Sequence, residues 1–333
     1  MKLAFAMDPS KTRHVLDEDA LTRLGRVCDV IAYEPLREFS SAAARKFLAE
    51  TDVLVTGWGC PRISSAVLAS APRLRLIAHA AGTVKSFIDP AVYARGIVVT
   101  NAVDANAIPV AEFTLAAIIM ANKQVLRFRD LYREDHKRAS SHALMDEPIG
   151  NYRRTIGIIG ASRIGRRVIG LLENLDCTVL LYDPFVPMSD PITANAELVD
   201  VDTLLARSDV VSLHAPSLPS TRGMIGARQL ALMRDGATFI NTARGALVDE
   251  AALIAELRTG RISAVIDVTD PEIAPDGSPL YGLPNVLLTP HMAGAVGTER
   301  SRLGRLVADE VERFVAGEPL RFAVEPDMLE QLA

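Results

Sequence analysis

Short apolar runs, each the length of a β-strand, alternate with segments of helical periodicity along the whole chain. The first third contains five such runs, LAFAM, VCDVIAY, DVLVTGW, RLIAHAA and IVVTNA. Six more follow later in the chain, TIGIIG, TVLLYD, DVVSLHAP, TFINTA, SAVIDV and VLLTPH. Strands that are apolar along their whole length are typical of parallel sheets covered by helices on both faces. The pattern therefore predicts an α/β protein with two doubly wound parallel sheets.

A long apolar helix is predicted between the two sets of strands. It starts near Val110, extends for about 25 residues and is apolar on more than one face, which is typical of a helix buried between domains or subunits. The polar residues 136–154 after it predict a loop. Further on, Asp249 as N-cap and Gly260 as the stop mark the two ends of a shorter helix.

Two successive α/β alternations predict two domains with a cleft between them. A last helix over residues 297–317 is expected to return to the first domain. The predicted first domain is therefore discontinuous, residues 1–101 with 295–333, and residues 102–294 form the second.

Composition places the chain among well-cored globular proteins, since 49% of its 333 residues are hydrophobic and 23% are charged. No apolar stretch reaches the roughly 18 residues of a membrane span, and the longest candidate, residues 110–121, contains Glu112. A net charge of −5 argues against nucleic acid as a partner, because phosphate binding needs a dense basic face. The three cysteines lie far apart without a CxxC pattern. They indicate a reducing, cytoplasmic location, and we predict no metal site.

A glycine-rich turn follows the run TIGIIG. Gly160, Ser162 and Gly165 occupy the three defining positions of a G-x-G-x-x-G dinucleotide fingerprint, with serine in the middle position. The first glycine permits a tight turn and the last permits close packing of helix on sheet, while the helix N-terminus offers N–H groups to a pyrophosphate. A strand–turn–helix without a ligand is the alternative interpretation of so short a motif.

An acidic residue follows the next predicted strand. Asp183 lies 18 residues after Gly165 (183 − 165), close to the spacing of roughly 20 expected for the carboxylate that binds the ribose hydroxyls. Such a carboxylate also repels a 2′-phosphate, so the sequence favours NAD over NADP. Alternatively, Asp183 starts a turn before Pro184.

Three polar residues with complementary chemistry follow later strands. They are Arg244 in NTARG, Glu272 in DVTDPE and His291 in TPHMAG. The carboxyl ends of parallel strands meet at one edge of a sheet, so the three side chains can converge there. An arginine binds a substrate carboxylate and polarises a carbonyl, a histidine exchanges a proton near neutral pH, and a carboxylate orients that histidine. Each residue alone is more simply a solvated or structural group; the conjunction favours catalysis.

The segments around these motifs resemble one enzyme family. GIIGASRIG, YDP, SDVVSLHAPSLPSTRGMIG, LMRDGATFINTARGALVDEAAL, AVIDVTDPE and LPNVLLTPHMAG are similar to D-2-hydroxyacid dehydrogenases. The similarity is dense over residues 155–294 and looser at HAAGTVKSFID and VTNAVDANAIPVAEFTLA. The resemblance implies a Rossmann-type NAD domain, a flavodoxin-like substrate domain and a small-molecule 2-keto or 2-hydroxy acid (D isomer) as substrate. The implied branch is the hydroxypyruvate/glyoxylate reductases or the phosphoglycerate dehydrogenases.

The same resemblance implies roles for single residues. Arg244, Glu272 and His291 are expected to be catalytic, and Ala81 and Gly82 to offer backbone N–H groups to the substrate carboxylate. Cofactor contacts are implied for Gly160, Ser162, Arg163, Ile164, Gly165, Asp183, His214, Pro216, Thr242, Ala243, Asp267 and Gly294. Asp267 is expected near the nicotinamide amide and His214 in the cofactor cleft. A solvated aspartate and a histidine bonded to backbone are the respective alternatives.

The chain departs from the family pattern at two positions. Ser162 stands where the fingerprint has its middle glycine, so we expect altered phosphate contacts, with the serine hydroxyl as a candidate donor. Ile273 follows Glu272 where the family usually has proline. The spacing from Asp267 to Glu272 is kept (272 − 267 = 5), so Glu272 retains its assignment.

The predicted substrate loop contains the only tryptophan of the chain, Trp58, between two glycines. It could form an aromatic wall over a small or apolar substrate tail, or pack in the core of the first domain. Arg62 is the one basic residue near it, which argues against a phosphorylated substrate. Glu272, rather than a glutamine, argues against formate.

The long apolar helix predicts a homodimer formed through the second domain, because a monomer would expose an apolar patch. Two other functional classes stay open. The chain could be an NAD-binding, corepressor-like regulatory protein with little turnover, or a dinucleotide-binding structural protein without activity.

Overall fold

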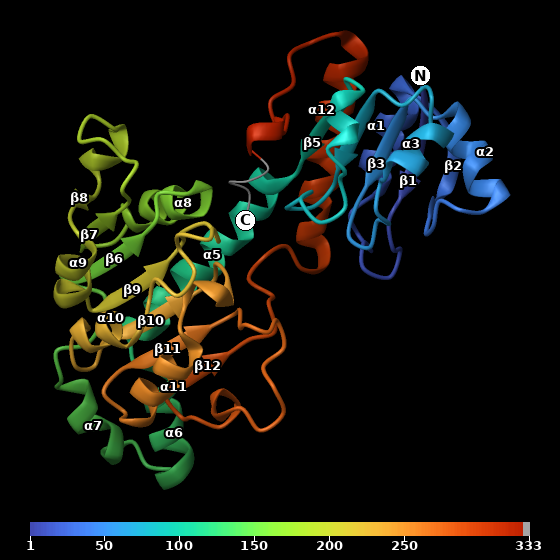
Figure 1. Ribbon diagram of the computed structural model, residues 1–333. Coiled ribbons are helices and arrows are strands. Elements are labelled where there is room, and N and C mark those ends of the chain that lie inside the picture. Colours follow the sequence, from blue (N-terminus) through green and yellow to red (C-terminus); the bar gives the residue numbers. More distant parts are fainter. Residues whose placement is uncertain (329–333) are drawn as a thin grey trace. The chain divides into compact units, whose positions relative to one another are not determined.

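A computed structural model describes residues 1–328, at residues 140 and 328 for the backbone only. The first sheet has five parallel strands in the order β2-β1-β3-β4-β5, which is the flavodoxin-like order (Figure 1). Its strands are β1 (Lys2–Ala6), β2 (Asp29–Leu36), β3 (Val53–Thr56), β4 (Leu76–His79) and β5 (Val98–Asn101). The helices that accompany it are α1 (Glu18–Val27), α2 (Ala42–Glu50), α3 (Ser65–Ser70), α4 (Ala91–Ala94) and α12 (Ser301–Ala316).

The second sheet has seven parallel strands in the order β12-β11-β10-β9-β6-β7-β8. The order reverses between β6 and β9, which creates the switch point where such sheets bind ligands. Its strands are β6 (Arg154–Ile159), β7 (Cys177–Tyr182), β8 (Glu197–Leu198), β9 (Val210–Leu213), β10 (Thr238–Asn241), β11 (Ser263–Ile266) and β12 (Val286–Leu288). Its helices are α5 (Val103–Asn122), α6 (Val125–Asp135), α7 (Ala139–Met145), α8 (Arg163–Leu172), α9 (Val201–Arg207), α10 (Ala227–Leu232) and α11 (Glu250–Arg258).

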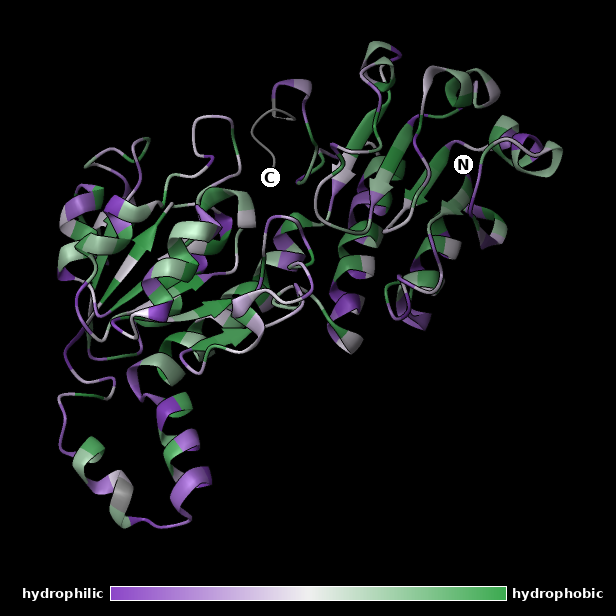
Figure 2. Ribbon diagram, turned by 60° about the horizontal axis from the view of Figure 1, so that its bottom comes forward, coloured by the Kyte–Doolittle hydropathy of each residue, from purple (hydrophilic) through white to green (hydrophobic). Residues whose placement is uncertain are grey.

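The prediction of two parallel, helix-covered sheets is confirmed. Figure 2 shows the strands of both sheets largely in the hydrophobic colour, while several of the covering helices carry both colours. Helix ends also follow the sequence signals. Asp249 accepts a hydrogen bond from the Ala252 N–H at 3.0 Å to cap α11, and Gly260 has a left-handed φ of +73° just beyond its end.

The predicted long helix is wrong in its bounds and its continuity. Helix α5 begins at Val103, not near Val110. The helical conformation is interrupted at Gln124, whose backbone is left-handed with a φ of +51°, and α6 starts at Val125. A non-glycine residue rarely adopts that region, so the periodicity alone gave no warning of the break. The loop predicted over residues 136–154 contains the short helix α7, and the two-residue strand β8 was not predicted.

Helix α5 is also longer than the apolar segment recognised in the sequence. By length and composition alone its 20 residues could cross a membrane, a test that core helices of globular proteins also pass, and 44% of its most apolar window is buried inside the protein. This corrects the expectation that no segment reaches the length of a membrane span.

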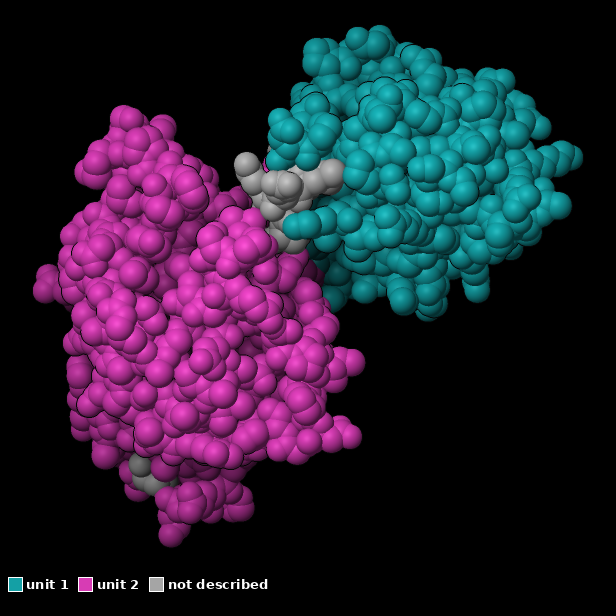
Figure 3. Space-filling model, viewed as in Figure 1, with its two compact units in different colours: residues 1–106, 295–333 teal, residues 107–294 magenta. Residues whose placement is uncertain are grey.

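The chain divides into two compact units (Figure 3). Residues 1–106 with 295–333 form the first unit, and residues 107–294 form the second. The division falls at residue 106, inside α5, whereas the sequence placed it at residue 101. The first unit is therefore built from both ends of the chain.

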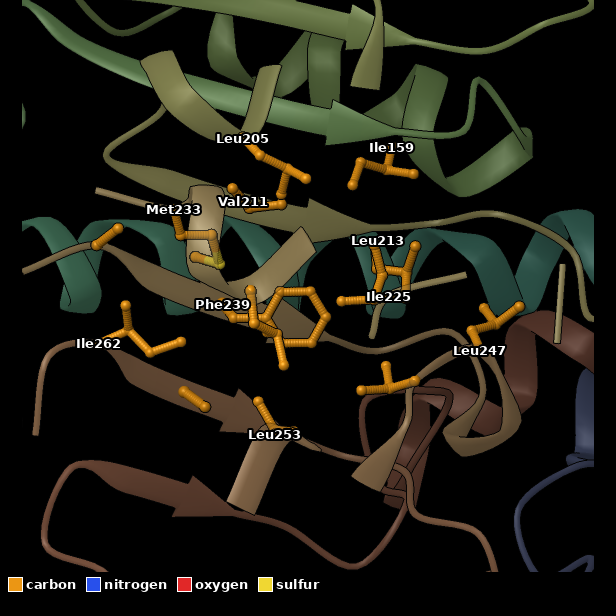
Figure 4. Packing of buried hydrophobic residues seen from close by; sticks show 14 of the residues in the cluster. Ile159, Leu205, Val211, Leu213, Ile225, Met233, Phe239, Leu247, Leu253 and Ile262 are labelled. Atoms are coloured by element: carbon orange, nitrogen blue, oxygen red, sulfur yellow. The ribbon is translucent and has the colours of Figure 1, made fainter. Parts of the chain in front are cut away.

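The strands of the second unit bury side chains on both faces. Phe239 lies in a cluster on one face that includes Leu213 and Leu253 (Figure 4), while its neighbour Ile240 belongs to the cluster on the other face, packed with Ile118 of α5. Alternating side chains point to opposite faces of a strand, so a continuous apolar run is required.

The first unit has a core on each face as well. One cluster joins Leu3 and Phe5 of β1 to Leu303 and Val307 of α12, although these elements lie about 300 positions apart in the sequence. The cluster on the other face includes Leu54 of β3. Helix α12 packs against α1 and β4 and thereby completes the first unit.

Candidate active site

The glycine-rich turn links β6 to α8 at the switch point of the second sheet. Gly160 has a φ of +98°, and a Cβ atom added there would lie 2.7 Å from the Ala215 nitrogen. A Cβ atom on Gly165 would lie 2.1 Å from the Gly160 carbonyl oxygen. Both positions therefore require glycine, one for the turn and one for the close approach of α8 to β6. These are the properties of a cradle for a dinucleotide pyrophosphate.

Ser162, the middle position of the fingerprint, is the N-cap of α8. Its φ of −64° suits any residue, and its Oγ accepts a hydrogen bond from the Gly165 N–H at 3.3 Å. The serine therefore satisfies one of the free N–H groups of the helix end, and its hydroxyl proton can be donated elsewhere. Arg163 and Ile164 form the first turn of α8 behind it.

Asp183 directly follows β7, the strand beside β6. Its Oδ2 accepts a hydrogen bond from the Ala161 N–H, and its Oδ1 accepts one from the Phe185 N–H, both at 2.8 Å. The second bond is the turn that was the alternative interpretation of this residue. The first ties the carboxylate to the glycine-rich turn, so the negative charge lies beside the cradle.

His214 and Pro216 follow β9 across the switch point from β6. The His214 ring is buried, and its Nε2 pairs with the Ser212 Oγ at 2.9 Å, whereas Nδ1 has no partner among the described residues. Burial lowers the pKa of His214 to about 3, so the ring is neutral at physiological pH. The Pro216 carbonyl accepts the Thr221 hydroxyl at 2.6 Å.

Arg244 lies just beyond β10, and the strand-end residue Asn241 fixes its backbone. The Asn241 amide donates to the Arg244 carbonyl oxygen and accepts from the Ala243 N–H, both at 3.0 Å. The Arg244 guanidinium donates to the Ala243 carbonyl oxygen at 2.6 Å. Burial lowers the pKa of Arg244, and the nearby Glu272 carboxylate opposes that shift. Thr242, also assigned to the cofactor site, is buried against Thr114 of α5, with 3.1 Å between their hydroxyl oxygens.

Glu272 and His291 are brought together from the loops after β11 and β12. The His291 Nδ1 is hydrogen-bonded to the Glu272 Oε1. Both side chains are partly exposed, 43% for His291 and 62% for Glu272. His291 has a left-handed φ of +52°, which is uncommon for a non-glycine residue and often marks functional sites. The pair can hold a proton at an accessible edge of the sheet.

Two residues that the sequence analysis did not single out, Gly245 and Thr269, connect the loops of Arg244 and Glu272. A Cβ atom on Gly245 would lie 2.0 Å from the Thr269 carbonyl carbon, so the loop of Arg244 lies directly on the loop of Glu272. The Thr269 hydroxyl contacts the carbonyl oxygens of Pro271 and Glu272 at 2.8 and 3.1 Å. In the sequence, the one sign of this contact between the two loops is the glycine that follows Arg244.

Asp267 directly follows β11 and is 1% exposed. Its carboxylate accepts hydrogen bonds from the Thr289 hydroxyl and from the N–H groups of Met292 and Ala293. The Asp267 carboxylate is therefore buried and hydrogen-bonded, and the alternative interpretation of a solvated aspartate is wrong. Gly294, the last residue assigned to the cofactor site, is also the last residue of the second unit.

Three of the predicted substrate-binding residues belong to the first unit. Thr56 of β3 is paired in register with His79 of β4, so Trp58 and the Ala81–Gly82 pair emerge from neighbouring strands at one edge of that sheet. Trp58 is half-buried against one core cluster, and the guanidinium of Arg300 lies 5.4 Å from the centre of its ring. Arg62 is 3.5 Å from the Asp89 carboxylate.

Comparison with known proteins places these features in one family. The family model "D-isomer specific 2-hydroxyacid dehydrogenase, NAD binding domain" matches residues 115–293. The D-3-phosphoglycerate dehydrogenase of Methanocaldococcus jannaschii is 32% identical over 308 residues, which cover 91% of this chain and 56% of that protein. The glyoxylate reductase of Korarchaeum cryptofilum is 34% identical over 270 residues, 81% of this chain and 80% of that protein.

A solved structure agrees with the sequence relatives. The D-lactate dehydrogenase with NAD+ from Lactobacillus jensenii superimposes with a TM-score of 0.79 at 27% identity, covering 98% of this chain and 100% of that one. The chain spans about half the length of the phosphoglycerate dehydrogenases that it matches. The family and the NAD cofactor predicted from the sequence are confirmed. The chain belongs to the D-isomer-specific 2-hydroxyacid dehydrogenase family, and its second unit is the NAD-binding domain of that family.

Proposed function

We propose that the chain is an NAD-dependent oxidoreductase that interconverts a 2-keto acid and the D isomer of the matching 2-hydroxy acid. The observation that carries the proposal is the hydrogen bond between His291 Nδ1 and Glu272 Oε1. It joins an imidazole to a carboxylate in the loops beyond two neighbouring strands of the NAD-binding domain. Hydride exchange at a carbonyl carbon requires such a proton donor and acceptor.

His291 is the acid and base in this proposal. Because Nδ1 is engaged with Glu272, Nε2 is the nitrogen that gives a proton to the carbonyl oxygen during reduction and takes it back during oxidation. Glu272 fixes the orientation of the ring through its hydrogen bond to Nδ1.

Arg244 binds the substrate carboxylate and polarises the carbonyl in the same scheme. Its guanidinium spends one donor on the Ala243 carbonyl, and no acceptor among residues 1–328 pairs with the others. A desolvated guanidinium with free donors favours a carboxylate strongly and in a fixed orientation. In the first unit, we propose the backbone N–H groups of Ala81 and Gly82 as donors to a substrate carboxylate.

The residues of the switch point fit NAD. The Gly160–Gly165 turn and the N-terminus of α8 would hold the pyrophosphate, and Asp183 the ribose hydroxyls. Thr242, Ala243 and Gly294 are proposed as further cofactor contacts, with Asp267 near the nicotinamide amide. Bound NADH supplies the hydride for reduction. The side chains of the protein bind and orient the substrate and move the proton.

The substrate tail is proposed to be small or apolar and not phosphorylated. Trp58 offers an aromatic wall, although its partial burial and its contact with Arg300 also give it a packing role. Arg62, the basic residue of the predicted substrate loop, lies beside the Asp89 carboxylate and is partly neutralised.

We further propose a cytoplasmic homodimer formed through the second unit. Helices α6 and α7 extend away from the rest of that unit (Figure 1), and α6 buries none of its residues within the chain. Val125, Tyr132 and Met145 of these helices are 38%, 60% and 50% exposed. The three cysteines are free thiols, as expected in a reducing compartment. Light scattering at micromolar concentration should give about twice the 35.9 kDa of one chain; a particle of one chain would refute the dimer.

The activity is tested with a panel of 2-keto acids, among them glyoxylate, pyruvate, hydroxypyruvate and an aromatic one, with NADH and with NADPH. We expect turnover with NADH, and we expect His291→Ala to lower kcat on the best substrate by about 10²–10⁴-fold. Lys46→Ala, at an exposed position of α2 in the first unit, is the control. NADH binding without turnover of any acid would instead indicate a regulatory or structural role.

A further inference from the structure

One buried carboxylate holds the loop that carries His291. The Asp267 backbone carbonyl accepts the His291 N–H at 2.8 Å. Its Oδ1 accepts the Thr289 hydroxyl at 2.6 Å and the Met292 N–H at 2.8 Å, and its Oδ2 accepts the Ala293 N–H at 2.9 Å. Four hydrogen bonds from one residue therefore span positions 289–293.

These hydrogen bonds stabilise an unfavourable backbone conformation at His291. His291 has its backbone in the left-handed region, which is unfavourable for a residue with a Cβ atom and persists only when the surroundings enforce it. Both neighbours of the strained segment, Thr289 before it and Ala293 after it, are tied to the same carboxylate. In a buried site such charge-assisted bonds are strong. The direction of the His291 side chain is thus set from Asp267.

We propose that Asp267 is a positioning residue for His291, acting through the loop and not by contact with the reacting atoms. This inference rests on the proposed function only for the role of His291. The carboxylate oxygens offer about four acceptor sites, and three are occupied by the loop. A bond to the nicotinamide amide, the role implied by the family resemblance, would be an addition to this one.

Buried polar side chains also hold the backbone of the two other loops that carry proposed catalytic residues. Asn241 at the end of β10 clamps the backbone of Arg244, and Thr269 contacts the backbone carbonyl of Glu272. Each is a buried polar residue that ends a strand or closely follows one and binds backbone groups a few positions ahead. Asp267 differs because the groups that it binds lie 22–26 positions further along the chain, in the loop of residues 289–293.

Two variants separate positioning from cofactor binding. Asp267→Asn keeps the volume of the side chain but places an NH2 group where one carboxylate oxygen accepts a hydrogen bond, so at least one of the bonds to the loop is lost. Thr289→Val keeps the carboxylate and removes only the hydroxyl that donates to it. Asp209→Asn is the control, because Asp209 also accepts a backbone N–H, that of Thr155, but lies at the amino end of β9, away from the loops that follow the strands. The ion pairs of Asp209 with Arg154 and Arg234 lie at that end of the sheet as well.

Steady-state kinetics and NADH binding by fluorescence are measured on the full chain. If Asp267 positions His291, Asp267→Asn lowers kcat by about 10–100-fold while the Kd for NADH changes less than about 3-fold, and Thr289→Val lowers kcat by a smaller factor in the same way. Asp209→Asn leaves both quantities near wild type. The proposal is overturned if Asp267→Asn weakens NADH binding by about tenfold or more with kcat at saturating NADH unchanged, or if Thr289→Val changes nothing.

Hydrogen exchange gives a readout that does not depend on turnover. The Met292 and Ala293 amides should exchange faster in Asp267→Asn than in the wild type, and the Thr155 amide should not. Unchanged exchange at positions 292 and 293 would contradict the proposal. If the wild type reduces no keto acid, the proposed function fails, and the exchange data still decide whether Asp267 holds the loop.

Discussion

Gly245 lies so close to Thr269 that a Cβ atom at position 245 would be 2.0 Å from the Thr269 carbonyl carbon. Two loops that carry proposed catalytic residues therefore touch through their backbones, with no side chain between them. Arg244 and Glu272 take their separation from this contact.

Gly245→Ala should push these loops apart. The added methyl group meets backbone, which cannot rotate away, so we expect a loss of about 1–3 kcal/mol in the free energy of unfolding and a lower kcat/KM. Urea denaturation and steady-state kinetics measure the two effects. Gly282→Ala, outside the α-helices and with open space around it, is the control and should keep both quantities near wild type. Full activity in Gly245→Ala would show that the loops tolerate displacement.

Glu272→Gln should lower kcat. The glutamine keeps the length of the side chain but replaces the charge-assisted hydrogen bond to His291 Nδ1 by a neutral one, so the ring is oriented less firmly. We expect kcat on the best keto acid to fall by about tenfold or more, measured by steady-state kinetics in both directions. A Glu272→Gln variant with wild-type kcat would mean that the carboxylate does not act on His291.

Arg244→Lys should keep a positive charge but lose the two-pronged geometry. We expect KM for the keto acid to rise about tenfold or more and kcat to fall, since a point charge neither fixes the carboxylate nor polarises the carbonyl in the same way. Arg26→Lys, at an exposed position of α1, is the control. A variant with wild-type KM would place the carboxylate elsewhere.

Asp183→Ala should narrow the preference for NADH over NADPH. The carboxylate beside the glycine-rich turn repels a 2′-phosphate, and its loss should change the ratio of the two kcat/KM values by about tenfold, which corresponds to ~1.4 kcal/mol. Asp176→Ala, at the other end of β7, should leave the ratio unchanged. Equal use of both cofactors by the wild-type protein would remove the basis of this prediction.

Two buried histidines should make the fold sensitive to acid. Burial lowers the pKa of His79 and of His214 to about 3 each, whereas an unfolded histidine titrates near 6.5. Between these values the unfolded chain binds protons that the folded chain does not. Stability is therefore retained above pH 6.5 and lost as pH falls toward 3, by about 1.4 kcal/mol per pH unit for each histidine.

His79→Gln should reduce the loss of folding stability at low pH. The unfolding midpoint in urea, measured at pH 7.5 and pH 5, should differ less for His79→Gln than for the wild type. His142→Gln, at an exposed position, should behave like the wild type. An equal pH dependence in all three proteins would show that His79 takes up its proton in the folded state.

The pattern of apolar residues predicted the strands well, but it did not predict where the long helix is interrupted. Among the described residues, apolar runs identified eleven of the twelve strands, most of which contain buried residues on both faces and are therefore apolar along their length. Strands β2 and β12 were identified in the same way although none of their residues is fully buried. The two-residue strand β8 is too short to have a pattern. The break at Gln124 depends on a left-handed backbone that no residue type requires.

For the candidate site, sequence reasoning found the side chains but not the contacts that position them. Arg244, Glu272 and His291 were recognisable because their chemistry is unusual after a buried strand. The roles of Gly245, Thr269 and Asp267 depend on contacts between loops up to 26 residues apart in sequence, such as the bond between Asp267 and Ala293. Such contacts exist only in the folded sheet, so spacing alone could not predict them.

The shared core of β1 and α12 also dictates an order of events on the ribosome. Residues 107–294 emerge as one continuous segment, so the second unit has all of its strands before Leu303 and Val307 are made. The sheet face of Leu3 and Phe5 emerges earlier than that segment, yet it stays uncovered until Leu303 and Val307 follow. During that interval the apolar face is exposed, and chaperones are expected to bind it.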